Sequence, residues 1–346
     1  MSKMTSMERV VTALSHKEPD RVPMFLLLTM HGAKDLGLSL KEYYSKAENV
    51  VEGQKILLNK YDNDCIFPFF YAAVETEAMG GEVIYYDDGP PNAGEPIIKR
   101  PQDIDNLEMP DFSRAPSLIK VLEATEALKE YSKNEVPLIN VVVSPFSLPV
   151  MQMGFEAYLN LMIENEEYFN KLMDFNIEFC VKWANLQLKA GATAICYFDP
   201  VSSTTIITRD QFIDKGFKVA KRTIPRIKGP VATHFASGRC LPIVDLLPDT
   251  GTIGIGVSCL EDLGEVKDKV RGKLAVFGNL NTVEMVRWTK EEAESKVKEA
   301  IEKAAPGGGF ILADNHGEIP YYVEEETLLS ISEAVKKYGR YPQDKQ

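Results

Sequence analysis

The stretch Phe310-Ile-Leu-Ala-Asp-Asn-His-Gly317 shows the pattern on which the fold prediction rests. Apolar residues follow one another without alternation, and polar residues come directly after them. A strand that is covered on both faces, as in a parallel sheet flanked by helices, has this continuous apolar pattern. The stretch Ala194-Ile-Cys-Tyr-Phe-Asp199 repeats it and also ends on a polar residue.

Eight apolar runs of this kind occur along the chain, at residues 23–28, 65–69, 138–143, 194–198, 231–234, 252–257, 274–277 and 310–313. Amphipathic helical patterns lie between them, at residues 40–60, 155–190, 209–221, 242–247, 260–270 and 290–304. Eight strands with helical crossovers predict an α/β fold, a (β/α)8 TIM barrel. A doubly wound open sheet is the alternative, but no GxGxxG motif follows the first strand.

The segment 81–100 interrupts this alternation. Its Gly89-Pro-Pro-Asn-Ala-Gly94 sequence is typical of a turn, so we expect a small β-hairpin or flap between two barrel units. The chain shows no internal repeat, low-complexity tract or linker that would divide it. Residues 1–346 are therefore expected to form a single barrel domain, a size that barrels commonly reach.

The composition excludes several classes of partner. The net charge of −12 disfavours nucleic acid and anionic membranes. No apolar run is long enough for a transmembrane helix or a signal peptide. The five cysteines are widely spaced and form no CxxC pair, which is typical of reduced thiols in a cytoplasmic protein.

Three of the four histidines follow predicted strands. His31 lies just past the first strand, His234 ends the fifth, and His316 follows the eighth. In a barrel the carboxyl ends of all strands meet at one mouth, where active sites are built. A single histidine at such a place is more often structural, but three at one rim favour a functional site.

Carboxylate and amide side chains occur at the same ends of the strands. Asp199 ends the fourth strand, Glu77 follows the second, and Glu318 lies two residues past His316. Such carboxylates can bind a metal, act as a general base or orient a histidine, although a helix cap or a loop ion pair is the simpler alternative. Asn279 follows the seventh strand and either binds substrate or shapes the turn.

Segments spread over nearly the whole chain also carry a family pattern. In order, they are Met7-Glu-Arg-Val-Val-Thr-Ala-Leu, Pro19-Asp-Arg-Val-Pro, Glu77-Ala-Met-Gly, Phe198-Asp-Pro, Thr233-His-Phe-Ala-Ser-Gly, Phe277-Gly-Asn-Leu-Asn and Gly309-Phe-Ile-Leu-Ala-Asp-Asn-His-Gly. Together they resemble the uroporphyrinogen decarboxylase superfamily, and within it the corrinoid-linked methyltransferases. The fold of that superfamily is a (β/α)8 barrel, which agrees with the strand count.

The resemblance allows two branches to be compared. Decarboxylases of the family use an arginine-rich segment after the first strand and an aspartate just past the second. Here these places read Leu27-Leu-Thr-Met-His-Gly32 and Ile66-Phe-Pro-Phe-Phe70, with neither arginine nor aspartate. A porphyrinogen with many carboxylates would lack its cationic partners, so decarboxylation is disfavoured.

The thiol-activating methyltransferases of the family hold zinc with a His-x-Cys pair after strand five and a Cys-Gly after strand eight. This chain has His234-Phe-Ala236 and His316-Gly317 instead. The resemblance therefore implies a possible zinc site at His234 and His316, completed by a carboxylate or a third histidine. Such a metal would polarise a leaving oxygen or nitrogen; a metal-free site in which a histidine donates the proton is the alternative.

The resemblance implies a methyltransferase that moves a methyl group between a small O- or N-methyl compound and the cobalt of a corrinoid. We expect the corrinoid to be carried by a partner protein, because no corrinoid-binding domain is visible in this chain. The expected catalytic residues are Asp199, Glu77, His31 and Asn279. Transfer from a methylcorrinoid to a thiol of the coenzyme M type, a decarboxylase-like lyase activity and a non-catalytic binding role are the alternatives.

Overall fold

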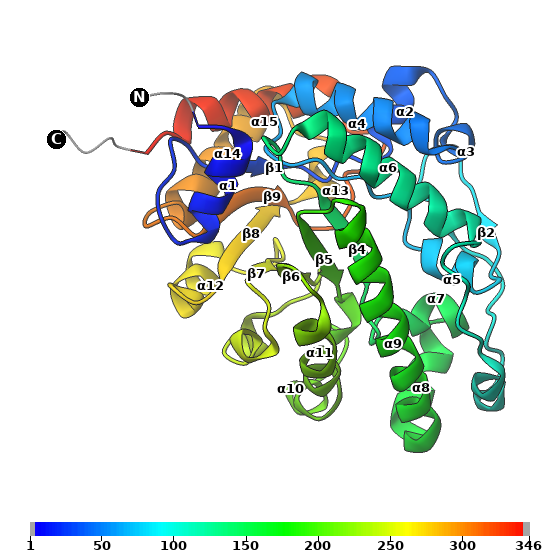
Figure 1. Ribbon diagram of the computed structural model, residues 1–346. Helices are drawn as coiled ribbons and strands as arrows, with labels where there is room; N and C mark the ends of the chain where they lie inside the picture. Colours follow the sequence, from blue (N-terminus) through cyan, green and yellow to red (C-terminus); the bar gives the residue numbers. More distant parts are fainter. Residues whose placement is uncertain (1–3, 342–346) are drawn as a thin grey trace.

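The structure is a computed structural model that describes residues 4–341 (Figure 1). Seven parallel strands form one sheet in the order β1-β9-β8-β7-β6-β5-β4. They are β1 (Met24–Phe25), β4 (Ile139–Val143), β5 (Ala194–Phe198), β6 (Val231–His234), β7 (Gly254–Gly256), β8 (Ala275–Leu280) and β9 (Phe310–Asp314). All five residues of β9 are buried, as the continuous apolar pattern predicted.

The segment between β1 and β4 completes the ring without forming a regular strand. Ile66 pairs with Leu138 in an isolated parallel bridge, and the Asp64 N–H donates to the Met24 carbonyl at 2.8 Å. The predicted second strand is therefore shorter than expected. Pro68 has no N–H to donate to a strand ladder, which explains why the pairing does not continue. The predicted (β/α)8 barrel is confirmed, with its second strand reduced to a bridge.

Helices surround the sheet on its outer side (Figure 1). They are α1 (Ser6–Leu14), α2 (His31–Leu36), α3 (Leu40–Tyr43), α4 (Ala47–Tyr61), α5 (Val74–Ala78), α6 (Pro116–Ser132), α7 (Pro149–Met153), α8 (Phe155–Glu164), α9 (Glu166–Ala190), α10 (Arg209–Gln211), α11 (Phe217–Thr223), α12 (Leu263–Val270), α13 (Thr282–Met285), α14 (Lys290–Ala304) and α15 (Glu325–Tyr338). Between residues 4 and 341, none of them is long and apolar enough to cross a membrane.

Three helix predictions need correction. The helix expected at 155–190 is two helices, because Asn165 leaves the helical conformation and its side chain caps α9 by accepting the Tyr168 N–H at 3.2 Å. The helix expected at 40–60 is likewise divided into α3 and α4. Residues 242–247 form only short 3-10 turns rather than an α-helix.

The segment 81–100 contains the predicted hairpin. β2 (Val83–Ile84) pairs antiparallel with β3 (Asn92–Ala93), in the register Val83 to Ala93. The turn between them includes Pro90, whose side chain reaches the mouth of the barrel and lines a cavity there. The hairpin therefore contributes to the site described below.

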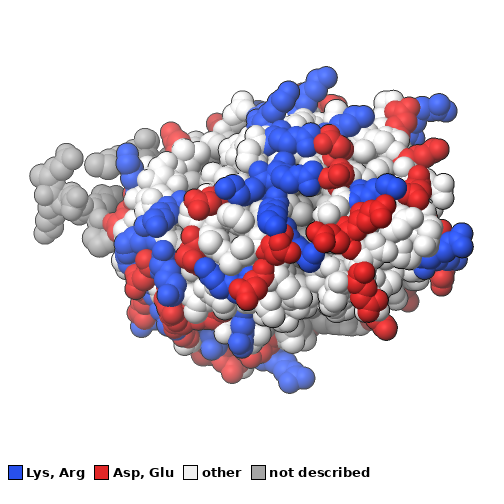
Figure 2. Space-filling model, turned by 90° about the horizontal axis from the view of Figure 1, so that it is seen from below, with Lys and Arg blue, Asp and Glu red and all other residues white. Residues whose placement is uncertain are grey.

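Basic and acidic side chains are interspersed over the face of the molecule drawn in Figure 2. Several pair across neighbouring helices: Arg222 with Asp174 at 2.6 Å, and Arg226 with Glu178 at 2.7 Å. Exposed pairs of this kind contribute little to stability, typically about 0–1 kcal/mol each.

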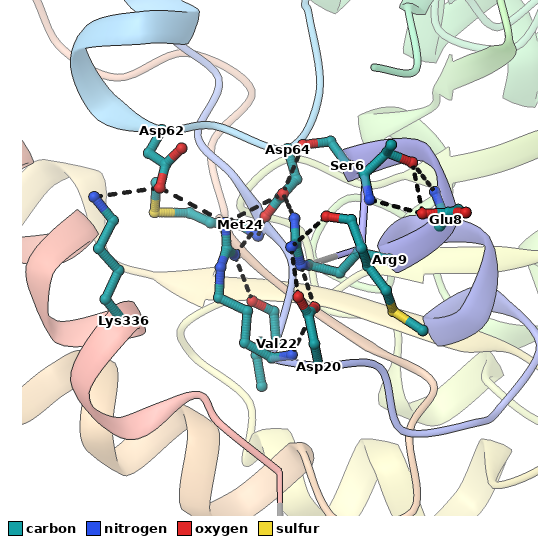
Figure 3. A network of polar contacts seen from close by, with 12 residues as sticks. Ser6, Glu8, Arg9, Asp20, Val22, Met24, Asp62, Asp64 and Lys336 are labelled. Atoms are coloured by element: carbon teal, nitrogen blue, oxygen red, sulfur yellow. Dashed lines mark hydrogen bonds and ion pairs between the residues drawn. The ribbon is translucent and has the colours of Figure 1, made fainter. Parts of the chain in front are cut away.

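The amino-terminal end of the barrel is closed by α1 and a buried ion-pair cluster (Figure 3). Val10 of α1 packs against apolar residues of the barrel interior. Arg9 is 2% exposed and contacts Asp20 and Asp64, each at 2.6 Å; Arg21 also contacts Asp64 at 2.6 Å. The Asp64 carboxylate in addition accepts the Met24 N–H at 2.8 Å, which ties the cluster to the first strand.

Candidate active site

A cavity of about 210 Å³ lies at the carboxyl-terminal mouth of the barrel. It is lined by Leu27, Phe67, Phe69, Ala72, Pro90, Val141, Cys196, Phe198, His234, His316, Gly317 and Glu318. Active sites of barrel enzymes occur at this end because the loops after all strands converge there. Most of the lining is apolar, and the polar side chains that can take part in acid–base chemistry are two histidines and one glutamate.

Glu318 is the carboxyl group of this cavity. The Thr29 hydroxyl donates to Glu318 Oε2 at 2.8 Å. Burial raises the pKa of Glu318 to about 7, and the nearby Asp314 carboxyl acts in the same direction. No Arg or Lys lines the cavity in the described part of the chain, so Glu318 has no guanidinium or ammonium partner there. Near neutral pH a substantial part of Glu318 is therefore protonated and able to donate a proton.

His234 ends β6, as predicted, and its ring lies at the floor of the cavity. Its Nδ1 accepts the Ala236 N–H at 2.9 Å. Burial, together with the neighbouring His316, lowers the pKa of His234 to about 4, so the ring is neutral near pH 7. A neutral ring that accepts at Nδ1 carries its proton on Nε2, which makes Nε2–H a hydrogen-bond donor.

The fit between His234 and β7 depends on a glycine. A Cβ atom on Gly256 would lie 2.8 Å from Cδ2 of the His234 ring. This is closer than real Cβ atoms pack, so the absence of a side chain at this position allows the ring to lie against the strand.

His316 follows β9 and lines the same cavity. Its Nδ1 lies 2.7 Å from the Thr282 hydroxyl. The Asn315 amide, in the orientation that satisfies its other neighbours, donates to this Nδ1 at 2.6 Å and to the Leu280 carbonyl at 2.9 Å. With Nδ1 as the acceptor, the ring proton is assigned to Nε2. Burial lowers the pKa of His316, so this ring is also neutral.

Two of the predicted catalytic residues have structural partners instead of facing the cavity. Asp199 is buried, and one oxygen of its carboxylate accepts from the hydroxyls of Ser144 and Ser147, the latter at 2.8 Å. Burial raises the pKa of Asp199 while these hydroxyls oppose the effect. The Asn279 amide donates to the carbonyls of Ser258 and Glu261, at 3.0 and 3.3 Å, and so shapes the loop after β7.

Glu77 and His31 are also not among the residues that line the cavity. Glu77 belongs to α5 and accepts the Tyr71 hydroxyl at 2.6 Å. His31 is the first residue of α2, rather than part of a loop, and is buried with no hydrogen-bond partner at either ring nitrogen. Burial lowers the pKa of His31 to about 3. Of the six predicted site residues, the mouth cavity thus brings together His234 and His316.

The donor set at the mouth does not fit a zinc ion. Within residues 4–341, no three His, Cys, Asp or Glu side chains lie close enough together to hold a metal. A ligand nitrogen must also offer its lone pair, but at His234 Nδ1 accepts the Ala236 N–H and Nε2 carries the proton. Zinc at His234 and His316 stays a prediction.

Comparison with known proteins gives matches over almost the whole chain. A curated relative, uroporphyrinogen decarboxylase from Actinobacillus pleuropneumoniae serotype 5b, is 24% identical and matches 82% of this chain and 81% of its own length. Methylcobamide:CoM methyltransferase MtbA from Methanosarcina acetivorans is also 24% identical, over 98% of this chain and 99% of its own.

A solved structure described as a methyltransferase from Methanosarcina mazei has the same fold. Its TM-score is 0.87 at 19% sequence identity, and the match covers 97% of this chain and 99% of that one. The family model for uroporphyrinogen decarboxylase (URO-D) matches residues 5–338. The relatives of this chain thus include both decarboxylases and methylcobamide methyltransferases. By the extent of the family match, the chain belongs to the uroporphyrinogen decarboxylase family.

Proposed function

We propose that this protein demethylates a small methylated compound, favouring an O-methyl group, and passes the methyl group to the reduced corrinoid of a partner protein. Glu318 acts as the general acid. Two properties of the mouth cavity support this proposal: its polar side chains can donate a proton or a hydrogen bond, and its remaining lining is mostly apolar. Both the decarboxylases and the methyltransferases of the family are enzymes, so a catalytic role agrees with either branch.

The position of Glu318 in the mouth cavity, together with its raised pKa, carries the proposal. When a methyl group leaves an oxygen, negative charge develops on that oxygen in the transition state. A carboxyl group with a pKa of about 7 is well matched to give up its proton at neutral pH. An amine released from a quaternary ammonium ion leaves as a neutral molecule and needs no proton, so Glu318 favours an oxygen leaving group over a nitrogen one.

The two neutral histidines would hold the leaving oxygen in place. Nε2–H of His234 and of His316 are donors of the kind that stabilises an oxyanion, and both residues line the cavity. In a cavity with a mostly apolar lining, such fixed donors contribute more than they would in solution. The Thr29 hydroxyl, bonded to Oε2 of Glu318, holds the carboxyl in position.

The proposed methyl transfer balances in atoms and in electrons. The corrinoid supplies the nucleophile and both electrons of the new bond to the methyl carbon. The bond between that carbon and the leaving oxygen breaks, and the oxygen takes the proton of Glu318, so that the released product is a hydroxyl compound. The Glu318 carboxylate is then reprotonated from solvent when the product leaves.

Decarboxylation of a porphyrinogen is less well supported by the same lining. Such a substrate carries many carboxylates, which need Arg or Lys partners when they are buried. Among the described residues that line the mouth cavity, none is Arg or Lys.

The proposal is tested by single-turnover methylation of reduced corrinoid with panels of methyl ethers, methylamines and methylated thiols. We expect methyl ethers to react fastest and the Glu318→Gln variant to lose this reaction. Consumption of no methylated donor, together with methylation of a thiol by methylcorrinoid, would show that the protein catalyses the opposite half-reaction. Release of carbon dioxide from a porphyrinogen would place it with the decarboxylases.

A further inference from the structure

A second cavity, of about 310 Å³, adjoins the mouth cavity. The two share Ala72 and Phe198 in their linings, so they meet at these residues. The second cavity lies beside the ends of β4, β5 and β6, and is bounded by α7 and the start of α8. We call it the side cavity.

The side cavity is apolar and uncharged. None of the described residues that line it is Asp, Glu, Lys, Arg or His. Of the four hydroxyl side chains in its lining, those of Ser147, Ser203 and Thr205 have protein partners: Ser147 donates to Asp199 at 2.8 Å, and Ser203 donates to the Pro200 carbonyl at 2.7 Å. Thr205 accepts the Arg239 N–H at 3.0 Å. A ligand in the side cavity therefore meets mainly carbon atoms.

Asp199 holds one wall of the side cavity in place. Its carboxylate joins the end of β5 to the hydroxyls of Ser144 and Ser147, in the loop between β4 and α7. The Val201 N–H completes this contact by donating to the Ser147 hydroxyl at 3.1 Å. Because these bonds fix the loop to the strand, the side cavity is formed before any ligand binds. The aspartate predicted as catalytic thus acts as a positioning residue.

The size of the side cavity limits the substrates that suit it. An apolar protein cavity of roughly 150 Å³ is enough to bind benzene. The side cavity, at about 310 Å³, exceeds this value, and the mouth cavity adds about 210 Å³. Methanol or a simple methylamine would make contact with only a small part of this surface. A substrate with a larger apolar group would fill it and gain about 25 cal/mol for each Å² of apolar surface buried.

We propose that the side cavity binds the part of the substrate that is not transferred, an uncharged apolar group of about the size of benzene. The group is aromatic or branched aliphatic, and it is joined to the methyl group through the oxygen that faces Glu318. This inference rests on the proposed function for its chemistry. Its binding, however, depends only on the two cavities and is measurable without any corrinoid.

The experiment uses the full chain and anisole as the probe, with binding followed by calorimetry or by NMR titration. In one variant, Val150→Trp places a large side chain into the side cavity from α7, where Val150 is only half-buried. In a second, Ile206→Trp does so from the opposite wall, at a residue that is 37% exposed and tolerant of change. The control is Val286→Trp, which lies just past α13 and outside both cavities.

We expect both side-cavity variants to weaken anisole binding tenfold or more, and the control to bind as the unchanged protein does. Equal binding by all four proteins, or no binding to the unchanged protein at millimolar anisole, would overturn the proposal. The outcome is separable from that of the proposed function. Binding of anisole without any methyl transfer would support the side cavity as a binding site and contradict the proposed demethylation. Transfer from methanol without anisole binding would do the reverse.

Discussion

The two ends of the barrel differ in whether their acidic side chains have cationic partners. At the amino-terminal end, Asp64 is fully buried and contacts both Arg9 and Arg21 at 2.6 Å (Figure 3). At the mouth, Asp314 is buried and Glu318 is partly buried, with no basic residue among their hydrogen-bond partners, and removal from water raises their pKa values to about 6 and about 7. The same kind of side chain is thus paired with guanidinium groups at one end and has no Arg or Lys partner at the other.

This difference distinguishes carboxylates that stabilise the fold from carboxyl groups that can take part in proton transfer. A buried carboxylate that is paired with guanidinium groups stays charged and holds segments of the chain together. A buried carboxyl without a cation has a raised pKa and can exchange its proton near neutral pH. Barrel enzymes commonly keep stability at the amino-terminal end of the strands and catalysis at the other end, and this pattern agrees with that division.

The largest effect on stability is expected from removing an arginine of the ion-pair cluster at the amino-terminal end. In Arg9→Met, Asp20 loses its main partner and Asp64 one of two, which leaves buried negative charge uncompensated. We expect the free energy of unfolding to fall by about 3–5 kcal/mol, measured by urea denaturation. The matched control is Arg271→Met, whose partner Asp268 is exposed; it should change stability by less than about 0.5 kcal/mol. Equal effects would mean that the cluster is not important for stability.

At the mouth, Glu318→Gln keeps the size of the side chain and removes the acidic proton. We expect single-turnover methyl transfer to fall about 100-fold or more, the usual contribution of a general acid. The Glu333→Gln variant on the exposed side of α15 serves as the control. The unfolding free energy of Glu318→Gln should stay near that of the unchanged protein below about pH 4.5, where the carboxyl is protonated in both the folded and the unfolded state. A loss of activity of less than threefold would exclude Glu318 as the proton donor.

Glu75 provides a pH-dependent test of the same contrast. This residue of α5 is buried, its Oε2 atom has no partner, and burial raises its pKa to about 8. Because the folded pKa lies above the unfolded value of about 4.3, the unchanged protein loses stability as pH rises from about 4.5 to 8. The Glu75→Gln variant, which can still accept the Val143 N–H, avoids this loss.

We therefore expect Glu75→Gln to match the unchanged protein at about pH 4 and to be more stable at pH 9 by about 2 kcal/mol or more, since one pKa unit is worth about 1.4 kcal/mol. Urea denaturation at the two pH values measures the difference. If the difference between the two proteins is the same at both pH values, Glu75 is not buried as a neutral carboxyl.

A smaller effect is expected from Thr29→Val. The Thr29 hydroxyl donates to Glu318 and so lowers its pKa, in opposition to burial. Removing the hydroxyl should raise the pKa of Glu318 further. In the unchanged protein the rate of methyl transfer should fall as pH rises through about 7; in Thr29→Val this fall should begin at a higher pH. A pH profile that moves down, or does not move, would contradict the assignment of the acid to Glu318.

The sequence predicted the barrel and part of the site. The apolar runs give the strands because burial on both faces leaves a continuous pattern, and His234 and His316 could be placed because each adjoins the end of a run. The second strand was predicted too long because Pro68 interrupts the ladder inside an otherwise typical apolar run. These features depend on neighbours in the sequence.

The remaining features of the site depend on neighbours that are distant in the sequence. Glu318 was noted only as a carboxylate near His316, because its burial and its bond from Thr29, 289 positions away, leave no local signal. Asp199 ends a strand as a catalytic residue would, but the hydroxyls of Ser144 and Ser147, more than 50 positions away, donate to one oxygen of its carboxylate. Sequence position therefore identified the end of the barrel, and only the packing separates residues that face the cavity from those that support it.

The protonation of Glu318 is the central claim, and infrared titration of its carboxyl stretch measures it directly. The carboxyl band of the unchanged protein, minus that of Glu318→Gln, isolates this residue at each pH. An apparent pKa near 7, with the band still present at about pH 6.5, is the result predicted here. A band that is lost near pH 4.5, as for a carboxyl in water, would show that Glu318 is ionised at neutral pH and cannot donate the proton to the leaving oxygen.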